Sequence, residues 1–115
     1  MRRGEIRLVD LDPVLGAEAN KRRPAVIVSN DGANSTADRL GRGVVTVVPV
    51  TSSTDRVYPF QVMLAASATG LGRDSKAQAE QVISVAVERI GALVGLVPPE
   101  LLARLDEALR LHLAL

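Results

Sequence analysis

Apolar and polar residues alternate along the start of the chain, a pattern typical of half-buried β-strands. Residues 5–11 (EIRLVDL) place Ile6 and Leu8 on one face and Arg7 and Val9 on the other, which predicts a strand. Short runs rich in β-branched residues predict further strands at 24–29, 43–53, 57–66, 76–85 and 92–97. Six short strands at this close spacing favour a small barrel over an open sheet.

Prolines and glycines indicate where these elements begin, bend and end. Pro24 opens the strand at 24–29, whereas Pro49 lies inside a strand and cannot donate a ladder hydrogen bond, so we expect a bulge or an edge there. Residues 12–23 predict a loop whose length is typical of functional loops. Residues 30–41 are expected to hold one or two helical turns, ended by Gly41.

The last part of the chain, residues 98–115, carries the clearest helical pattern. Pro98 and Pro99 suit a helix start, and Glu100 follows near the positive end of the helix dipole. One stripe contains Leu101, Leu105, Ala108 and His112, with Leu102, Leu109 and Leu113 beside it. The whole pattern predicts a mainly β protein with helices (α+β), folded as one domain over residues 1–115.

Composition and charge exclude several classes of protein. The chain has no cysteine, which excludes disulfides, a thiol nucleophile and a thiolate metal site. It has neither an apolar run near the ~20 residues of a membrane helix nor the apolar core of a signal peptide, so we expect a cytoplasmic protein without a membrane partner. The net charge is only +1, so attraction for a polyanion must come from a local patch. Tyr58 and Phe60 are the only aromatic residues, too few for an extensive base-stacking surface.

Three candidate sites are better explained by ordinary structure. His112 is a potential general base, but a lone histidine on the apolar stripe of a helix is more often structural. Residues 69–75 (TGLGRDS) resemble a phosphate loop but lack its Lys-Ser/Thr ending, which favours a plain turn. Asp10, Asp12 and Glu18 are scattered and lack histidine or cysteine support, so we expect neither a metal nor a cofactor.

A basic cluster and a hydroxyl-rich strand end form the remaining candidate site. Arg22 and Arg23, with Lys21 before them, suit bidentate binding of a phosphate, and the hydroxyls at 51–53 suit hydrogen bonds to the same group. RNA carries its own nucleophile, the 2′-hydroxyl, so such a site needs neither a metal nor a catalytic histidine. Taken alone, these residues are explained more simply by a solvated loop and an ordinary strand end.

Five blocks of the sequence, in order along nearly the whole chain, change this balance. They are RRGEIRLVDLDPVLGAEANKRRPAVIVSND, VVPVTSS, YPFQV, AEQVISV and LDEALRLHL. With these blocks the chain resembles the MazF/PemK family of toxin endoribonucleases. The resemblance implies an SH3-like barrel of the CcdB/PemK type with a C-terminal helix, and a homodimer. It also implies metal-independent cleavage of single-stranded RNA to a 2′,3′-cyclic phosphate and a 5′-hydroxyl.

The resemblance also implies roles for individual residues. Arg23 and Thr51 fall on the positions that carry the reaction. The substrate-binding residues implied are Lys21, Arg22, Ser52, Ser53, Glu80 and Gln81. Arginine is a poor base, so Arg23 is interpreted as a charge stabiliser and proton donor, and the general base stays open.

Departures from the family pattern and the expected partners complete these expectations. Arg7 stands where the family often has an aromatic residue, and Ile83 where a cation is common, so the RNA sequence that is cut does not carry over. The expected partners are RNA, a second copy of the chain, and a cognate antitoxin of the MazE type with an acidic, partly disordered segment. Two alternatives stay open: a non-enzymatic, CcdB-like toxin that binds DNA gyrase, and a barrel that has lost its nuclease activity. The Arg23–Thr51 pair is the discriminating feature, because a gyrase-binding toxin would place its function on the C-terminal residues and would not need this pair.

Overall fold

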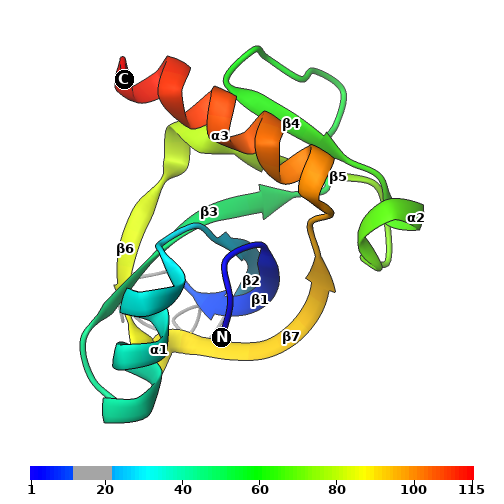
Figure 1. Cartoon of the computed structure of the whole chain (residues 1–115). Coiled ribbons are helices and arrows are strands. Elements are labelled where there is room, and N and C mark those ends of the chain that lie inside the picture. Colours follow the sequence, from blue (N-terminus) through cyan, green and yellow to red (C-terminus); the bar gives the residue numbers. More distant parts are fainter. Residues whose placement is uncertain (12–21) are drawn as a thin grey trace, which may run out of the picture.

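The fold is a curved antiparallel sheet with two longer helices (Figure 1), seen in a computed structural model that describes residues 1–11 and 22–115. In this part of the chain the strands are β1 (Glu5–Asp10), β2 (Arg22–Ile27), β3 (Val44–Thr51), β4 (Gln61–Leu64), β5 (Ser75–Gln78), β6 (Ile83–Ala86) and β7 (Ile90–Leu96). The helices are α1 (Asp31–Leu40), α2 (Ala66–Thr69) and α3 (Pro99–Leu113), with short 3₁₀ turns η2 (Ala79–Gln81) and η3 (Val87–Arg89).

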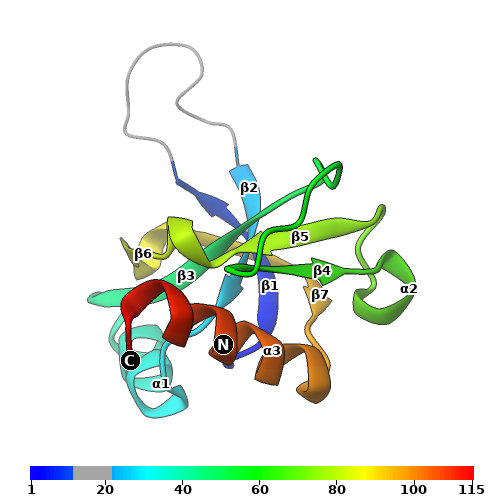
Figure 2. The ribbon, with the colours of Figure 1, turned by 90° about the horizontal axis from the view of Figure 1, so that it is seen from above.

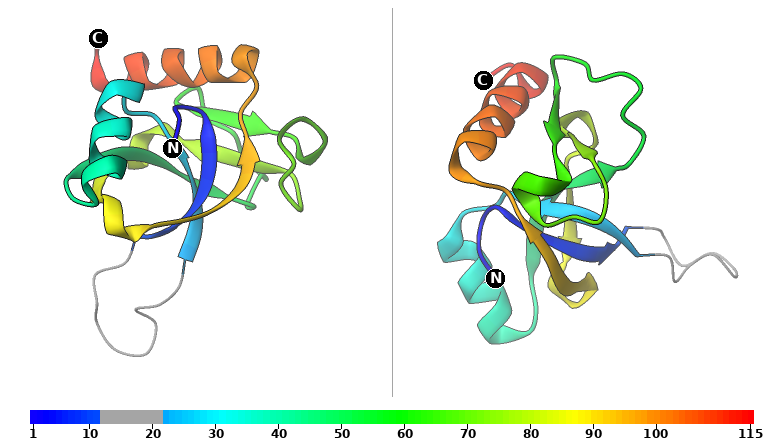
Figure 3. Two further views of the ribbon diagram at one scale, coloured as in Figure 1. Left: turned by 60° about the horizontal axis from the view of Figure 1, so that its bottom comes forward. Right: turned by 90° about the vertical axis from the view of Figure 1, so that its right-hand side faces the viewer.

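The strands follow the order β4–β5–β3–β2–β1–β7, and β6 pairs with the first half of β3. All these pairings are antiparallel. The ends of the path, β4 and β7, are not paired with each other within the described residues, so the barrel is strongly curved but open. With α3 at the C-terminal end, this confirms the prediction of a small barrel with a C-terminal helix. Both longer helices lie at the opposite end of the molecule from the start of β2 (Figures 2 and 3).

Pro49 lies in a central strand. The register between β2 and β3 runs without a bulge from Val47 to Pro49. On the other side of β3, residues 44–47 pair with β6 and residues 50–51 pair with β5. On the side of β3 away from β2, the proline therefore falls between the residues that pair with β6 and those that pair with β5. Its missing N–H is tolerated because no strand of the described part pairs with Pro49 on this side. The predicted bulge is therefore absent, whereas the predicted edge is found locally, on one side of β3 at Pro49.

Two strands differ in extent from their predictions. The run at 76–85 is not one strand, because η2 separates β5 from β6 and these two strands pair with opposite ends of β3. The strand predicted at 57–66 is confined to β4, because Tyr58 and Phe60 belong to the segment before it, where their rings stack with centroids 5.4 Å apart. The described part therefore holds seven strands, where the pattern predicts six.

The core has two clusters, and β1 contributes one residue to each. Ile6 packs in the cluster beneath α3, together with Leu105 of that helix. Val9 packs in the second cluster, which includes Ala37 of α1. The two residues lie on opposite faces, as the alternation predicts, yet both are fully buried because each face of β1 meets one of the clusters. His112 of α3 is exposed and lines neither of the two cavities around Arg23 that are described below.

The caps of α1 show why this helix is longer than expected. The side chain of Asn30 accepts a hydrogen bond from the backbone N–H of Ala33 at 2.8 Å, and Gly41 ends the helix in the left-handed conformation (φ 66°). Inside the helix the fully buried Asn34 donates to the carbonyl of Ser29 at 2.8 Å. This contact anchors α1 to the chain that leaves β2, and the helix runs for 10 residues. None of the helices in the described ranges is long and apolar enough to cross a membrane.

Glu5 and Arg7 form an ion pair along β1, with Nε of Arg7 2.9 Å from Oε1 of Glu5. Burial raises the pKa of Glu5, but a hydrogen bond from the backbone of Arg2, together with the hydrogen bond and charge of Arg7, outweighs it. The resulting pKa of Glu5 lies below its ordinary value of 4.5.

Candidate phosphate-binding cavity

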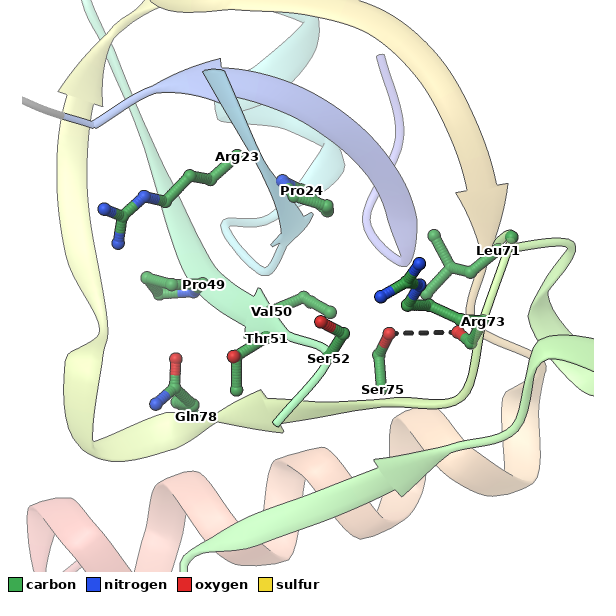
Figure 4. Close-up of a pocket in the computed structure, with 11 residues that line it drawn as sticks. Arg23, Pro24, Pro49, Val50, Thr51, Ser52, Leu71, Arg73, Ser75 and Gln78 are labelled. Carbon is green, nitrogen blue, oxygen red and sulfur yellow. Dashed lines mark hydrogen bonds between the residues drawn. The ribbon is translucent and has the colours of Figure 1, made fainter. Parts of the chain in front are cut away.

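A cavity of about 540 Å³ opens where the start of β2 meets the end of β3 (Figure 4). Its walls come from β2 (Arg23, Pro24), the end of β3 and the residue after it (Pro49, Val50, Thr51, Ser52), the segment before β5 (Leu71, Gly72, Arg73) and β5 itself (Ser75, Gln78). Antiparallel pairing positions these walls: Ala25 lies opposite Pro49, and Val50 lies opposite Ala77. The cavity thus brings together Arg23 and Thr51, the two residues predicted to carry the chemistry.

The hydroxyl of Thr51 is held in place by the chain that follows it. Its oxygen accepts a hydrogen bond from the backbone N–H of Ser53 at 3.2 Å. A hydroxyl that accepts in this way still has its own proton to donate. Thr51 therefore offers a donor to a ligand in the cavity, with Ser52 beside it on the same wall.

Arg23 is exposed, and its side chain forms no hydrogen bond or ion pair with any residue in the described part of the chain. It also lines a second cavity of about 330 Å³, which shares Pro49 and Gln78 with the first and adds Gln81 and Ile83. The two cavities are therefore neighbours, and Arg23 lines both of them. Gln81, predicted to bind substrate, lies in the second one.

Arg22 does not line either cavity. Successive residues of a strand point to opposite sides, and the guanidinium of Arg22 occupies the space that a Cβ at Gly91 of β7 would need. The two arginines that the sequence treats as one cluster are therefore separated by the strand, with Arg23 alone toward Thr51.

The other predicted binding residues have different surroundings. Ser53 contributes its backbone N–H to Thr51 and is not part of the cavity wall. Oε2 of Glu80 accepts a hydrogen bond from Nε2 of Gln61 at 2.7 Å, and its Oε1 is buried without a partner among the described residues. Glu80 thus faces β4 rather than either cavity. Lys21 lies outside the described residues.

The polar groups of the first cavity favour an anion. Its described lining contains two arginines, three hydroxyl groups and one amide, and no carboxylate or imidazole. Across residues 1–11 and 22–115, no group of three or more histidine, cysteine, aspartate or glutamate side chains lies close enough to hold a metal ion. A guanidinium beside hydroxyl donors matches the geometry and charge of a phosphate group.

Comparison with known proteins identifies the family. The model of the PemK-like, MazF-like toxin of type II toxin–antitoxin systems matches residues 2–113. The chain belongs to this toxin family. It is 65% identical over 115 residues to endoribonuclease MazF9 of Mycobacterium tuberculosis, and this match covers 100% of this chain and 98% of that relative.

Solved structures of similar fold include complexes with antitoxins. The MazE–MazF complex (form III) of Deinococcus radiodurans contains a chain with a TM-score of 0.77 and 25% identity, covering 100% of this toxin and 97% of that chain. An endoribonuclease in complex with its cognate antitoxin from a mycobacterial species also has a TM-score of 0.77, with coverage of 100% and 96%. At 23% identity, this second likeness is one of fold.

Arg73, Ser75 and Gln78 are cavity residues of the toxin that sequence reasoning missed. The motif at 69–75 lacks the ending of a phosphate loop. It spans the end of α2, the connection after Gly70 (φ 84°) and the start of β5, and the pairing of β5 with β3 carries it to the cavity. Its glycines and arginine were the available signal.

Proposed function

We propose that this toxin is an endoribonuclease that cuts single-stranded RNA in the Arg23–Thr51 cavity. The observation that carries the proposal is a guanidinium and a donor hydroxyl that line one cavity. Among the described residues this guanidinium has no partner, and the described lining of the cavity has no carboxylate. Support comes from the relative named as an endoribonuclease, which is 65% identical along the whole chain.

In the proposed reaction, the 2′-oxygen of a ribose attacks the adjacent phosphorus and the bond from phosphorus to the 5′-oxygen breaks. The products are a 2′,3′-cyclic phosphate and a 5′-hydroxyl. The five-coordinate intermediate carries more negative charge than the starting diester, and preorganised donors that meet this charge accelerate the step. Arg23 supplies the positive charge and Thr51 a hydrogen bond to a phosphate oxygen.

Arg23 also takes part in proton transfer. Guanidinium is protonated at neutral pH, so Arg23 does not act as a base. It stabilises the charge and donates a proton to the leaving 5′-oxygen, and water then returns a proton to Arg23. None of the described lining residues is a base at neutral pH. The proton of the 2′-hydroxyl therefore leaves to water or to a group outside this set.

Because the nucleophile belongs to the RNA and the arginine meets the charge, we propose that the reaction needs neither a metal nor another cofactor. The test is to incubate the purified protein with a long RNA in EDTA and to map the 5′ ends of the fragments. Cleavage at defined sites in EDTA supports the proposal. Cleavage that requires added Mg²⁺ would refute the metal-free mechanism, and inhibition of DNA gyrase without RNA cleavage would favour the CcdB-like alternative.

We further propose that an acidic, partly disordered segment of a cognate antitoxin inhibits this toxin by occupying the cavity. Carboxylates on such a segment can replace RNA phosphates at Arg23, and a disordered segment can cover a large surface as it folds. Saturating antitoxin peptide should then exclude a non-cleavable RNA, and more weakly as salt rises. Simultaneous binding of both, with unchanged affinities, would place the antitoxin elsewhere.

We also propose that the toxin acts in the cytoplasm as a homodimer. The end of α3 exposes Leu111 and Leu113, and the chain after it exposes Leu115, with exposed fractions of 58%, 48% and 84%. A second copy would cover such apolar area. Light scattering at micromolar concentration should give twice the mass of one chain, and the mass of a single chain would contradict the dimer.

A further inference from the structure

Arg73 enters the first cavity from the side opposite Arg23 (Figure 4). It belongs to the segment between α2 and β5, whereas Arg23 belongs to β2. Arg73 lines only the first cavity, while Arg23 lines both. The two arginines therefore lie at different parts of this pair of neighbouring cavities.

The backbone at Arg73 and just after it is held by its neighbours. Oδ1 of Asp74 accepts a hydrogen bond from the backbone N–H of Ala66 at 2.8 Å. The hydroxyl of Ser75, which is buried, donates to the carbonyl oxygen of Arg73 itself at 3.0 Å. A side chain on a backbone fixed in this way loses less freedom when it binds a ligand.

The guanidinium of Arg73, by contrast, is not used by the fold. Arg73 is exposed, and its side chain has no hydrogen bond or ion pair within the described part of the chain. The nearest carboxylate in sequence, that of Asp74, is directed to Ala66. A fixed backbone that presents an unpaired planar donor group to a cavity is an arrangement suited to bidentate binding of a phosphate.

We propose that Arg73 binds a phosphate of the RNA backbone next to the linkage that is cut. This inference rests on the proposed function. A volume of about 540 Å³ lies in the range of pockets that hold whole small molecules, so the cavity is larger than a single phosphate needs. With Arg23 and Thr51 at the cut linkage, the opposite wall receives the neighbouring nucleotide. Ser52, whose hydroxyl lies on the wall between Thr51 and the Arg73 side in Figure 4, offers a second donor there.

The test uses a single-stranded 2′-O-methyl RNA that contains a mapped cut site, because this RNA lacks the nucleophile and stays intact. Its Kd is measured at several salt concentrations for the wild type, Arg73→Ala and Arg39→Ala. Arg39 is a matched control, since it is an exposed arginine on α1 that lines none of the cavities described above. Each phosphate contact on a single strand contributes roughly 0.7 to the slope of log Kd against log salt.

Arg73→Ala should bind more weakly, and its salt slope should be lower by roughly 0.7. The ratio of its Kd to that of the wild type should therefore shrink by about 2.6-fold between 50 and 200 mM salt. In cleavage assays the substitution should raise KM and change kcat little, because the contact lies away from the reacting phosphate. Arg73→Lys should restore the salt slope but only part of the affinity, since lysine lacks the bidentate fork.

Two results would count against the inference. If the wild type cuts RNA and Arg73→Ala matches Arg39→Ala in slope and KM, the phosphate contact of Arg73 is wrong and the proposed function stands. If the wild type neither binds nor cuts RNA, the proposed function fails and this inference fails with it.

Discussion

Replacing Arg23 by alanine should abolish most of the activity without unfolding the protein, whereas replacing Arg22 should not. The two residues are adjacent, carry the same charge and are both exposed, so each is the control for the other. Arg23 lines the cavity with Thr51, whereas the guanidinium of Arg22 lies over Gly91 on the other side of β2. Only Arg23 is therefore placed to meet charge that develops on a phosphate.

The magnitudes follow from these positions. Removal of one preorganised donor to a developing charge typically costs about 10²–10³ in kcat, roughly 2.7–4 kcal/mol. Arg22 contributes only long-range attraction, so its loss should cost less than about 10-fold, and less still as salt screens it. Neither exposed side chain has a partner in the described residues, so each substitution should change the free energy of unfolding by less than about 0.5 kcal/mol.

The assay measures single-turnover cleavage of a fluorescent RNA at saturating protein, together with urea unfolding of both variants. The expected result is a large loss of rate for Arg23→Ala, a small loss for Arg22→Ala and nearly equal stabilities. Equal losses of rate in the two variants would refute a positioned Arg23 and would indicate a diffuse basic patch.

Three further predictions test other parts of the structure. Thr51→Val keeps the shape but removes the donor, and should lower kcat by about 10- to 100-fold; an unchanged kcat would exclude the hydroxyl from the reaction. Gly95→Ala would place a Cβ 2.7 Å from the backbone oxygen of Thr69, so urea unfolding should show a loss of about 1–3 kcal/mol, and wild-type stability would show that this close approach is relieved without cost. The pKa of Glu5 is lower in the folded protein than in the unfolded chain. Glu5 therefore adds stability above its unfolded pKa, and this stability is lost as the pH falls through its folded pKa. The wild type should therefore be more stable than Glu5→Gln at neutral pH and should lose this advantage in acid below the ordinary 4.5, whereas a pH-independent difference would contradict the Glu5–Arg7 pair.

Local patterns predicted most of the elements. Each of three elements lies where a short stretch of sequence indicates it. These stretches are the apolar stripe of α3, the β-branched run of β3 and the glycine that ends α1. The division of the run at 76–85 into two strands could not be predicted from the local pattern. It arises because β5 and β6 pair with opposite ends of β3.

The candidate site shows the same limit. Arg23 and Thr51 follow from the family blocks, and the cavity brings them together. Which of two adjacent arginines faces the cavity depends on the register of β2, which a run of like charges does not encode. Arg73 reaches the cavity through a β3–β5 pairing that spans more than twenty residues of sequence, so no local motif could place it there.

In the proposed function, this toxin cuts RNA by using the 2′-hydroxyl of its substrate. A comparison of two matched RNAs tests this mechanism directly. A synthetic RNA containing a mapped cut site is incubated in EDTA beside a copy that has a single 2′-deoxyribose immediately 5′ of the cut, and the fragment ends are identified by mass spectrometry. We expect a 2′,3′-cyclic phosphate and a 5′-hydroxyl from the first RNA and no cleavage of the second. Cleavage of the deoxy-substituted RNA at the same site, or fragments with a 3′-hydroxyl and a 5′-phosphate, would contradict this mechanism.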